Sequence, residues 1–198
     1  MTEIDYKYWA FISYSHRDEA WAASLHRKLE TYHVPRALRG KPTATGTVPR
    51  RLFPIFRDRD ELAGAADLGV KIRRALEQSR HLIVICSPNS AASPWVNQEI
   101  KAFKALGRDD RVLCFIVAGE PHASEVPGNA SQECFPPAAR FRVGSSGDLI
   151  DELAEPLAAD ARKGKDGAAN AVLKLMAGML EVGFDDLKQR EKLRKRRR

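Results

Sequence analysis

The chain has 198 residues, of which 43% are hydrophobic and 30% are charged, as in ordinary soluble globular proteins. Its formal net charge of +7 belongs to one end: residues 188–198 contain eight Lys or Arg and one Glu, and residues 1–187 sum to zero. Because the body is neutral and contains no recognition motif, we expect no nucleic-acid partner. No apolar run approaches the about 18 residues of a membrane-spanning helix, which excludes a span within this sequence.

Cysteine and histidine usage argues against a disulfide framework and a metal centre. Cys86, Cys114 and Cys134 form no CxxC pair, and the first two lie in apolar runs, where cysteine is usually a small buried hydrophobe. The five histidines are scattered without metal-ligand spacing. Residues 1–8 carry two acidic residues and no long apolar stretch, so they do not form a signal peptide. We therefore expect a cytoplasmic protein without a metal site.

Short apolar runs alternate with amphipathic helical segments, a pattern typical of a parallel sheet covered by helices. The first run, 9–14, predicts a strand. A helix then opens at Asp18 and ends before Pro35, with Trp21, Leu25 and Leu29 on its apolar face. Residues 33–51 are rich in Pro, Gly, Arg and Thr and predict one long loop.

The other elements follow with the same alternation. Pro54 makes the second strand an edge strand, and the third strand is apolar on both faces and should be central. Ser93 and Pro94 form a helix start. The expected elements are strand 52–56, helix 67–79, strand 82–86, helix 94–106, strand 112–117, a weaker strand around 140–143 and a helix over 146–159.

The C-terminal part predicts a linker over 162–167, a helix over 168–180 and, after Gly183, the basic tail. We expect two parts, a core domain at 1–160 and a helical extension with the tail at 161–198. The simplest interpretation of the tail is a solvated helix extension. A second is the cytosolic flank of a membrane helix in a longer, membrane-anchored chain that continues after Arg198.

Four motifs follow one another along these elements. They are Phe11-Ile12-Ser13-Tyr14-Ser15, then Phe56-Arg57-Asp58 with Asp60-Glu61-Leu62 and Gly64, then Cys86-Ser87-Pro88, and finally Trp95-Val96-Asn97-Gln98-Glu99. In this order and spacing they resemble a bacterial Toll/interleukin-1 receptor (TIR) domain, over about residues 6–160. The resemblance implies a flavodoxin-like α/β fold: a five-stranded parallel sheet in the order 2-1-3-4-5 with helices on both faces. The long 33–51 loop departs from the family pattern.

Two functions come with this resemblance. Some TIR domains are adaptor modules that signal by homotypic assembly, and others cleave the nicotinamide–ribose bond of NAD. In the enzymatic group a Trp-x-x-x-Glu motif after the third strand supplies the catalytic glutamate, which here corresponds to Trp95 and Glu99. The resemblance also implies that the active site is completed by self-association.

The residues themselves suit that chemistry. In the 2-1-3-4-5 order the crevice opens between the carboxyl ends of strands one and three. The residues there are Ser13-Tyr14-Ser15-His16 after strand one and Ser87-Pro88-Asn89 after strand three. Glu99 lies four residues after a tryptophan, so the two share a helix face. A carboxylate can stabilise an oxocarbenium-like ribose, and an aromatic ring can hold the departing base.

Each candidate also has a structural interpretation. Glu99 could be a solvated surface residue and Trp95 a packing residue, while His16 could cap the following helix. Ser87 could bind ribose or phosphate, or cap the turn before Pro88. Asp58 could orient polar groups at the cleft mouth, or form ion pairs within an Arg-rich loop.

The leading hypothesis is an NAD⁺ nucleosidase that acts in signalling or bacterial defence. It would release nicotinamide and ADP-ribose or a cyclic ADP-ribose product, with Glu99 catalytic. NAD is then the substrate, and no cofactor is expected, since GxGxxG and P-loop motifs are absent. The alternative is a non-enzymatic TIR interaction module that assembles through residues 58–67.

Overall fold

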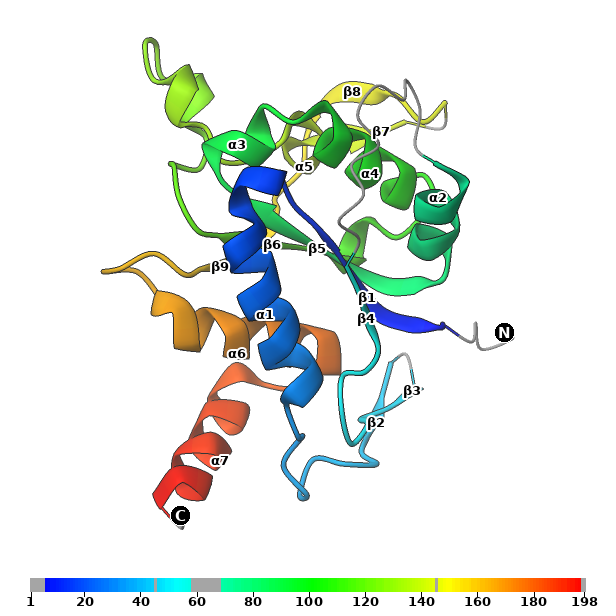
Figure 1. Cartoon of the computed structure of the whole chain (residues 1–198), viewed down its shortest axis with the longest axis vertical. Coiled ribbons are helices and arrows are strands. Elements are labelled where there is room, and N and C mark those ends of the chain that lie inside the picture. The colour runs from blue at the N-terminus through cyan, green and yellow to red at the C-terminus, as the bar shows by residue number, and fades with distance from the viewer. Residues whose placement is uncertain (1–5, 45, 58–68, 145, 197–198) are drawn as a thin grey trace.

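A parallel five-stranded sheet forms the centre of the computed structural model, which describes residues 6–44, 46–57, 69–144 and 146–196 (Figure 1). Its strands lie in the order β4–β1–β5–β6–β9, and every neighbouring pair is parallel. Counted within this sheet, that is the expected order 2-1-3-4-5, so the flavodoxin-like α/β fold is confirmed. The strands are β1 (Tyr8–Ser13), β4 (Ile55–Phe56), β5 (Ser79–Cys86), β6 (Val112–Ile116) and β9 (Leu157–Asp160).

Helices cover both faces of the sheet because successive strand residues alternate between two apolar cores. In the central strand β5, Ile83 belongs to one core and Leu82 to the other. Side chains of the first and sixth helices fill the first core, and those of the second and fourth fill the other. These helices are α1 (Glu19–Thr31), α6 (Gly167–Leu180), α2 (Val70–Glu77) and α4 (Pro94–Lys104).

The first helix buries two of the three residues that its sequence suggests, Leu25 and Leu29, together with Ala22. Trp21, also expected on this face, is 37% exposed, and its ring meets Phe115 edge-on with 6.2 Å between the centroids. Trp21 therefore lies at the border of the buried face.

The end of the sheet corrects two predictions. Residues expected as the fifth strand, 140–143, contribute β7 (Phe141–Val143), which pairs antiparallel with β8 (Leu149–Leu153) in a separate ribbon. The helix expected over 146–159 is not formed, because this stretch supplies β8 and most of β9 instead. The sequence of β9, Leu-Ala-Ala-Asp, has little strand preference, and its pairing with β6 decides its conformation.

The long segment 33–51 packs against the first core. It contains a small antiparallel pair, β2 (Pro42–Thr43) and β3 (Gly46–Thr47), and buries Val34, Leu38 and Val48 in the first core. Figure 1 shows it at the end of the molecule where the parallel strands begin, opposite to their carboxyl ends. This segment therefore completes the first core at the end where the parallel strands begin.

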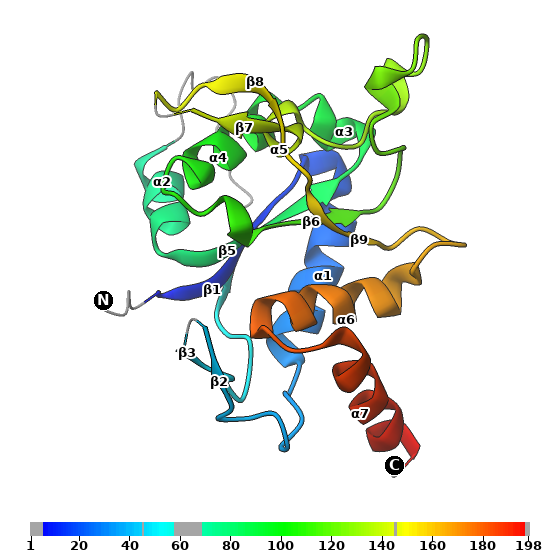
Figure 2. The same cartoon turned by 180° about the vertical axis from the view of Figure 1, so that it is seen from behind.

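The C-terminal helices close the first core. The sixth helix lies across the sheet beside β9 and β6 (Figure 2) and buries Val172, Leu175 and Met176. It is followed by α7 (Phe184–Arg196), so the basic segment expected to extend as a solvated helix is helical as far as Arg196. Leu187 at its start is fully buried. Within the described residues, no helix has the length and apolarity to cross a membrane.

Short helical elements fill the remaining connections. They are η1 (His16–Asp18), α3 (Pro88–Ala91), η2 (Asp109–Arg111), η3 (Ala123–Glu125), η4 (Ala130–Gln132) and α5 (Pro137–Arg140).

Candidate functional site

The carboxyl ends of β1 and β5 lie side by side, as the strand order requires, since Ser13 is paired with Val84. The chain leaves β1 into η1 and α1, and leaves β5 into α3. These two connections depart to opposite faces of the sheet (Figure 1). Such a switch point is where open α/β sheets bind ligands.

A polar contact joins Glu99 to this switch point. Ser13, the last residue of β1, is 1% exposed, and its Oγ donates a hydrogen bond to Oε2 of Glu99 over 2.5 Å. Glu99 is half-buried and lies on α4, 86 residues away along the chain. The structure therefore places this carboxylate at the end of β1 and not on a remote helix surface.

The start of α4 sets where Glu99 points. Ser93 Oγ accepts a hydrogen bond from the amide of Val96 over 3.4 Å, and Pro94 occupies the first helical position, as predicted. Trp95, one turn before Glu99, is half-buried against the second core. The tryptophan thus has the packing role considered above and shares a helix face with the carboxylate.

Asp18 ties the two connections of the switch point together. Its carboxylate accepts hydrogen bonds from Ser87 Oγ at 2.5 Å and from Asn89 Nδ2 at 3.1 Å. The same Ser87 hydroxyl accepts hydrogen bonds from the amides of Asn89 and Ser90, which makes it the cap of α3. Ser87 is 1% exposed. In this structure the Ser87 hydroxyl positions the backbone at the switch point.

The other predicted residues lie around the same edge with different exposure. Tyr14 is half-buried against the first core, Ser15 is 5% exposed and precedes η1, and His16 is exposed. Asp58 falls outside the described residues, as does the assembly loop 58–67. The structure thus places Tyr14, Ser15 and His16 directly after β1 and Ser87 directly after β5, while Tyr14 packs against the first core and Trp95 against the second.

Two residues of the site, Asp18 and Arg57, escaped the sequence analysis, which placed Ser13 at the crevice but did not predict its contact with Glu99. Asp18 is expected there only as a helix opener. Arg57 follows β4, is 13% exposed and lies 3.7 Å from the carboxylate of Glu19, while its buried Nη1 has no hydrogen bond. A polar residue at the last position of an apolar strand was the available signal for Ser13.

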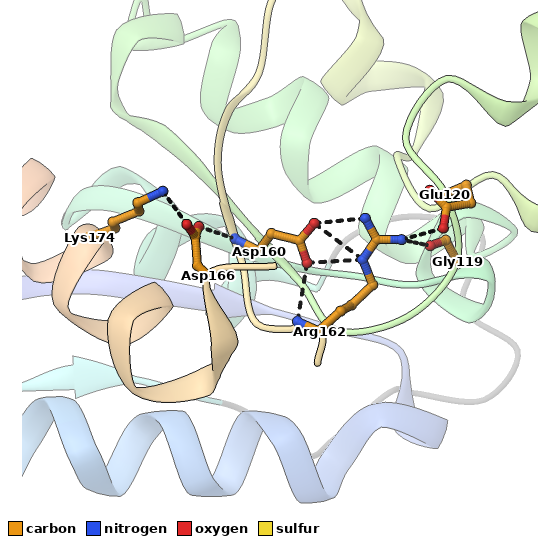
Figure 3. A network of polar contacts seen from close by, with 6 residues as sticks. All are labelled: Gly119, Glu120, Asp160, Arg162, Asp166 and Lys174. Atoms are coloured by element: carbon orange, nitrogen blue, oxygen red, sulfur yellow. Dashed lines mark hydrogen bonds and ion pairs between the residues drawn. The ribbon is translucent and has the colours of Figure 1, made fainter. Parts of the chain in front are cut away.

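A polar network closes the far edge of the sheet, at the carboxyl ends of β6 and β9 (Figure 3). The guanidinium of Arg162 contacts both carboxylate oxygens of Asp160, the carboxylate of Glu120 and the carbonyl of Gly119. The hydrogen bonds from Arg162 lower the pKa of Asp160. The network keeps the loop after β6 attached to the last strand.

Asp166 extends this network to α6. It accepts hydrogen bonds from the Asp160 amide at 3.1 Å and from Lys174 Nζ at 2.5 Å. Burial works to raise the pKa of Asp166, but these donors prevail and lower it. The start of α6 is thus fixed to the sheet edge.

The three cysteines are buried and form no disulfide. Burial raises the pKa of Cys134 to about 12, and burial likewise raises that of Cys86, so both thiols stay neutral at pH 7. Among the described residues, no group of three or more His, Cys, Asp or Glu side chains could hold a metal ion.

Comparisons with known proteins agree with this geometry. A family model described as TIR domain matches residues 10–135. NAD(+) hydrolase ApTIR of an Actinoplanes species is 34% identical over an aligned length of 206 positions, gaps included, and this alignment covers 96% of this chain. Protein toll of Drosophila melanogaster is 32% identical over 98 residues, or 50% of this chain. The chain covers 25% of the first relative's length and 8% of the second's.

Proposed function

Because this chain belongs to the TIR domain family, we propose that it is an NAD⁺ nucleosidase that cleaves the bond between nicotinamide and ribose. The observation that carries the proposal is the position of Glu99, whose carboxylate meets Ser13 at the end of β1. The similarity to a protein named as an NAD(+) hydrolase supports the same substrate. The products would be nicotinamide and ADP-ribose or a cyclic ADP-ribose.

The reaction needs little covalent help from the protein. The bond between ribose C1′ and the pyridinium nitrogen breaks, and its electron pair neutralises the departing nicotinamide. Positive charge then develops on the ribose, and a fixed carboxylate stabilises it electrostatically. Water adds at C1′ and loses a proton to give ADP-ribose, or a nucleophilic atom of the adenine base adds to give a cyclic product. We assign the stabilising role to Glu99.

The surrounding residues would hold the substrate. Trp95 offers an aromatic surface beside the carboxylate, and Tyr14, Ser15 and His16 lie where the chain leaves β1. We expect Ser87 and Asp18 to shape this crevice by fixing the start of α3. Asp58 remains a candidate for the cleft mouth.

Assembly, location and biological role extend the proposal. We expect copies of the domain to associate through TIR–TIR contacts in the cytoplasm, so that local concentration controls activity in signalling or defence. Activity should then rise faster than linearly with protein concentration. Strict proportionality from dilute protein upward would contradict assembly control.

The first test is nicotinamide release from NAD⁺ at high protein concentration, with Glu99→Gln and Glu152→Gln side by side. Both substitutions remove one negative charge with little change in shape, but Glu152 is an exposed residue of β8. We expect Glu99→Gln to lose activity and Glu152→Gln to keep it. If folded, clustered wild-type protein releases no nicotinamide, the domain acts as an interaction module instead.

A further inference from the structure

The fold brings together two basic segments that lie about 140 residues apart in the sequence. Residues 33–51 contain five Lys or Arg and no Asp or Glu, and residues 188–198 have a net charge of +7. The rest of the chain therefore carries a net charge of −5. From this arrangement we infer that the basic end of the molecule docks onto the surface of an anionic lipid membrane.

Direct contacts join the two segments. Arg194 Nη1 donates a hydrogen bond to the carbonyl of His33 over 3.1 Å, and the hydroxyl of Tyr32 donates one to Glu191 over 3.0 Å. Burial raises the pKa of Tyr32, and the nearby Glu191 carboxylate raises it further, so the phenol remains a donor. These contacts hold the basic helix α7 against the loop that follows α1.

Most cations at this junction have no acidic partner. A hollow of about 420 Å³ is lined by Arg36, Arg39 and Arg194 together with His33, Val34 and Pro35. Arg194 lies 3.4 Å from the Glu191 carboxylate, but within the described part of the chain no ion pair is formed by the loop cations Arg36, Arg39, Lys41, Arg50 or Arg51. The arginines of this hollow suit a phosphate group, which arginine binds in a bidentate manner.

Exposed apolar side chains near these cations favour a lipid surface over a nucleic acid. Phe53 is 56% exposed, with the guanidinium of Arg51 5.6 Å from its ring centre, and Leu193 on α7 is 49% exposed. Apolar side chains among basic ones are typical of proteins that lie on membranes. The two basic segments themselves contain no Trp, Tyr or Phe that could stack on nucleic-acid bases.

The shape of the molecule suits a planar partner. The turn after α1, the β2–β3 pair and the end of α7 all reach the same end of the longest axis (Figures 1 and 2). Glu99 meets Ser13 at the carboxyl end of β1, and the carboxyl ends of the parallel strands lie toward the other end. A docked molecule would therefore keep its candidate active site away from the membrane.

The test is sedimentation of the full chain with vesicles that contain about one third phosphatidylserine, compared with pure phosphatidylcholine vesicles. The variant Arg36→Gln/Lys41→Gln/Arg50→Gln removes three exposed cations of the basic end. At about 1 kcal/mol per cation it should weaken binding about a hundredfold at low salt. The matched control, Arg142→Gln/Lys163→Gln/Lys165→Gln, removes three exposed cations elsewhere and should bind like wild type.

Three outcomes would overturn the inference. They are equal binding to the two kinds of vesicle, equal weakening by both triple variants, and tight binding of a DNA or RNA oligonucleotide without binding to anionic vesicles. Because vesicle binding is measured without NAD⁺, a failure to bind vesicles is independent of the proposed hydrolase activity. Far-ultraviolet circular dichroism of each variant confirms that it is folded.

Discussion

Ser13 and Glu99 form a hydrogen bond of 2.5 Å between the last residue of β1 and the middle of α4. The serine hydroxyl is held by a buried strand, so it fixes the position of one carboxylate oxygen of Glu99.

Ser13→Ala should lower kcat for NAD⁺ cleavage by about ten- to a hundredfold, because a hydrogen bond to a charged group contributes about 1.5–3 kcal/mol. Steady-state assays with wild type and variant give the ratio. Ser79→Ala is the matched control: Ser79 is another buried strand serine, whose hydroxyl donates to the carbonyl of Ala75 at 2.7 Å, far from the crevice. Equal losses in both variants would refute a positioning role for Ser13.

Asp18→Ala should destabilise the fold by about 2 kcal/mol, because it leaves the buried Ser87 hydroxyl and the Asn89 amide without their acceptor. Urea denaturation measures the change. In a double-mutant cycle, Asp18→Ala and Ser87→Ala should be clearly non-additive, since each removes the same bond. Additive effects would show that the two residues act separately.

Leu175→Ala should cost about 2–5 kcal/mol of unfolding free energy, because Leu175 of α6 is 2% exposed within the first core. Leu193→Ala on α7 is the control, since its side chain is 49% exposed and its loss should cost less than about 0.5 kcal/mol. Chemical denaturation of both variants distinguishes the two sites. Similar small effects would mean that α6 adds little to the core.

Stability should fall as the pH is lowered from 7 to 5, in part through His81. The pKa of His81 is lowered to about 4, mainly by burial and to a smaller extent by Arg80 and Arg111, while its hydrogen bond to the carbonyl of Trp9 opposes the shift. The unfolded chain, with an ordinary histidine pKa of about 6.5, binds the proton first. The free energy of unfolding therefore falls by about 2 kcal/mol between pH 7 and pH 5.

Urea denaturation of wild type and of His81→Gln, each at pH 7 and at pH 5, tests the contribution of His81. The glutamine can still donate to the Trp9 carbonyl but does not titrate. The difference in the free energy of unfolding between pH 7 and pH 5 should be about 2 kcal/mol smaller in the variant than in wild type. An unchanged difference would assign the acid sensitivity to other groups.

Much of the architecture could be predicted because local patterns and burial agree. The run 82–86 is apolar throughout and becomes the doubly buried central strand, and Ser93-Pro94 starts α4 as its sequence indicates. The motif that contains Glu99 also identified the family. The last strand could not be predicted, because β9 is stabilised by its pairing with β6 and not by its own composition.

The sequence by itself determined the order of the parallel strands up to β6 and of the main helices between them, the family and the candidate carboxylate, since these follow from periodicity and motif spacing along the chain. Only the tertiary structure decided that Ser13 would hold Glu99, that Asp18 would join Ser87, and that loop 33–51 would meet the basic helix. Each of these pairs residues far apart in sequence. Such contacts arise when the sheet closes and two cores are packed, and no local pattern encodes the distance between them.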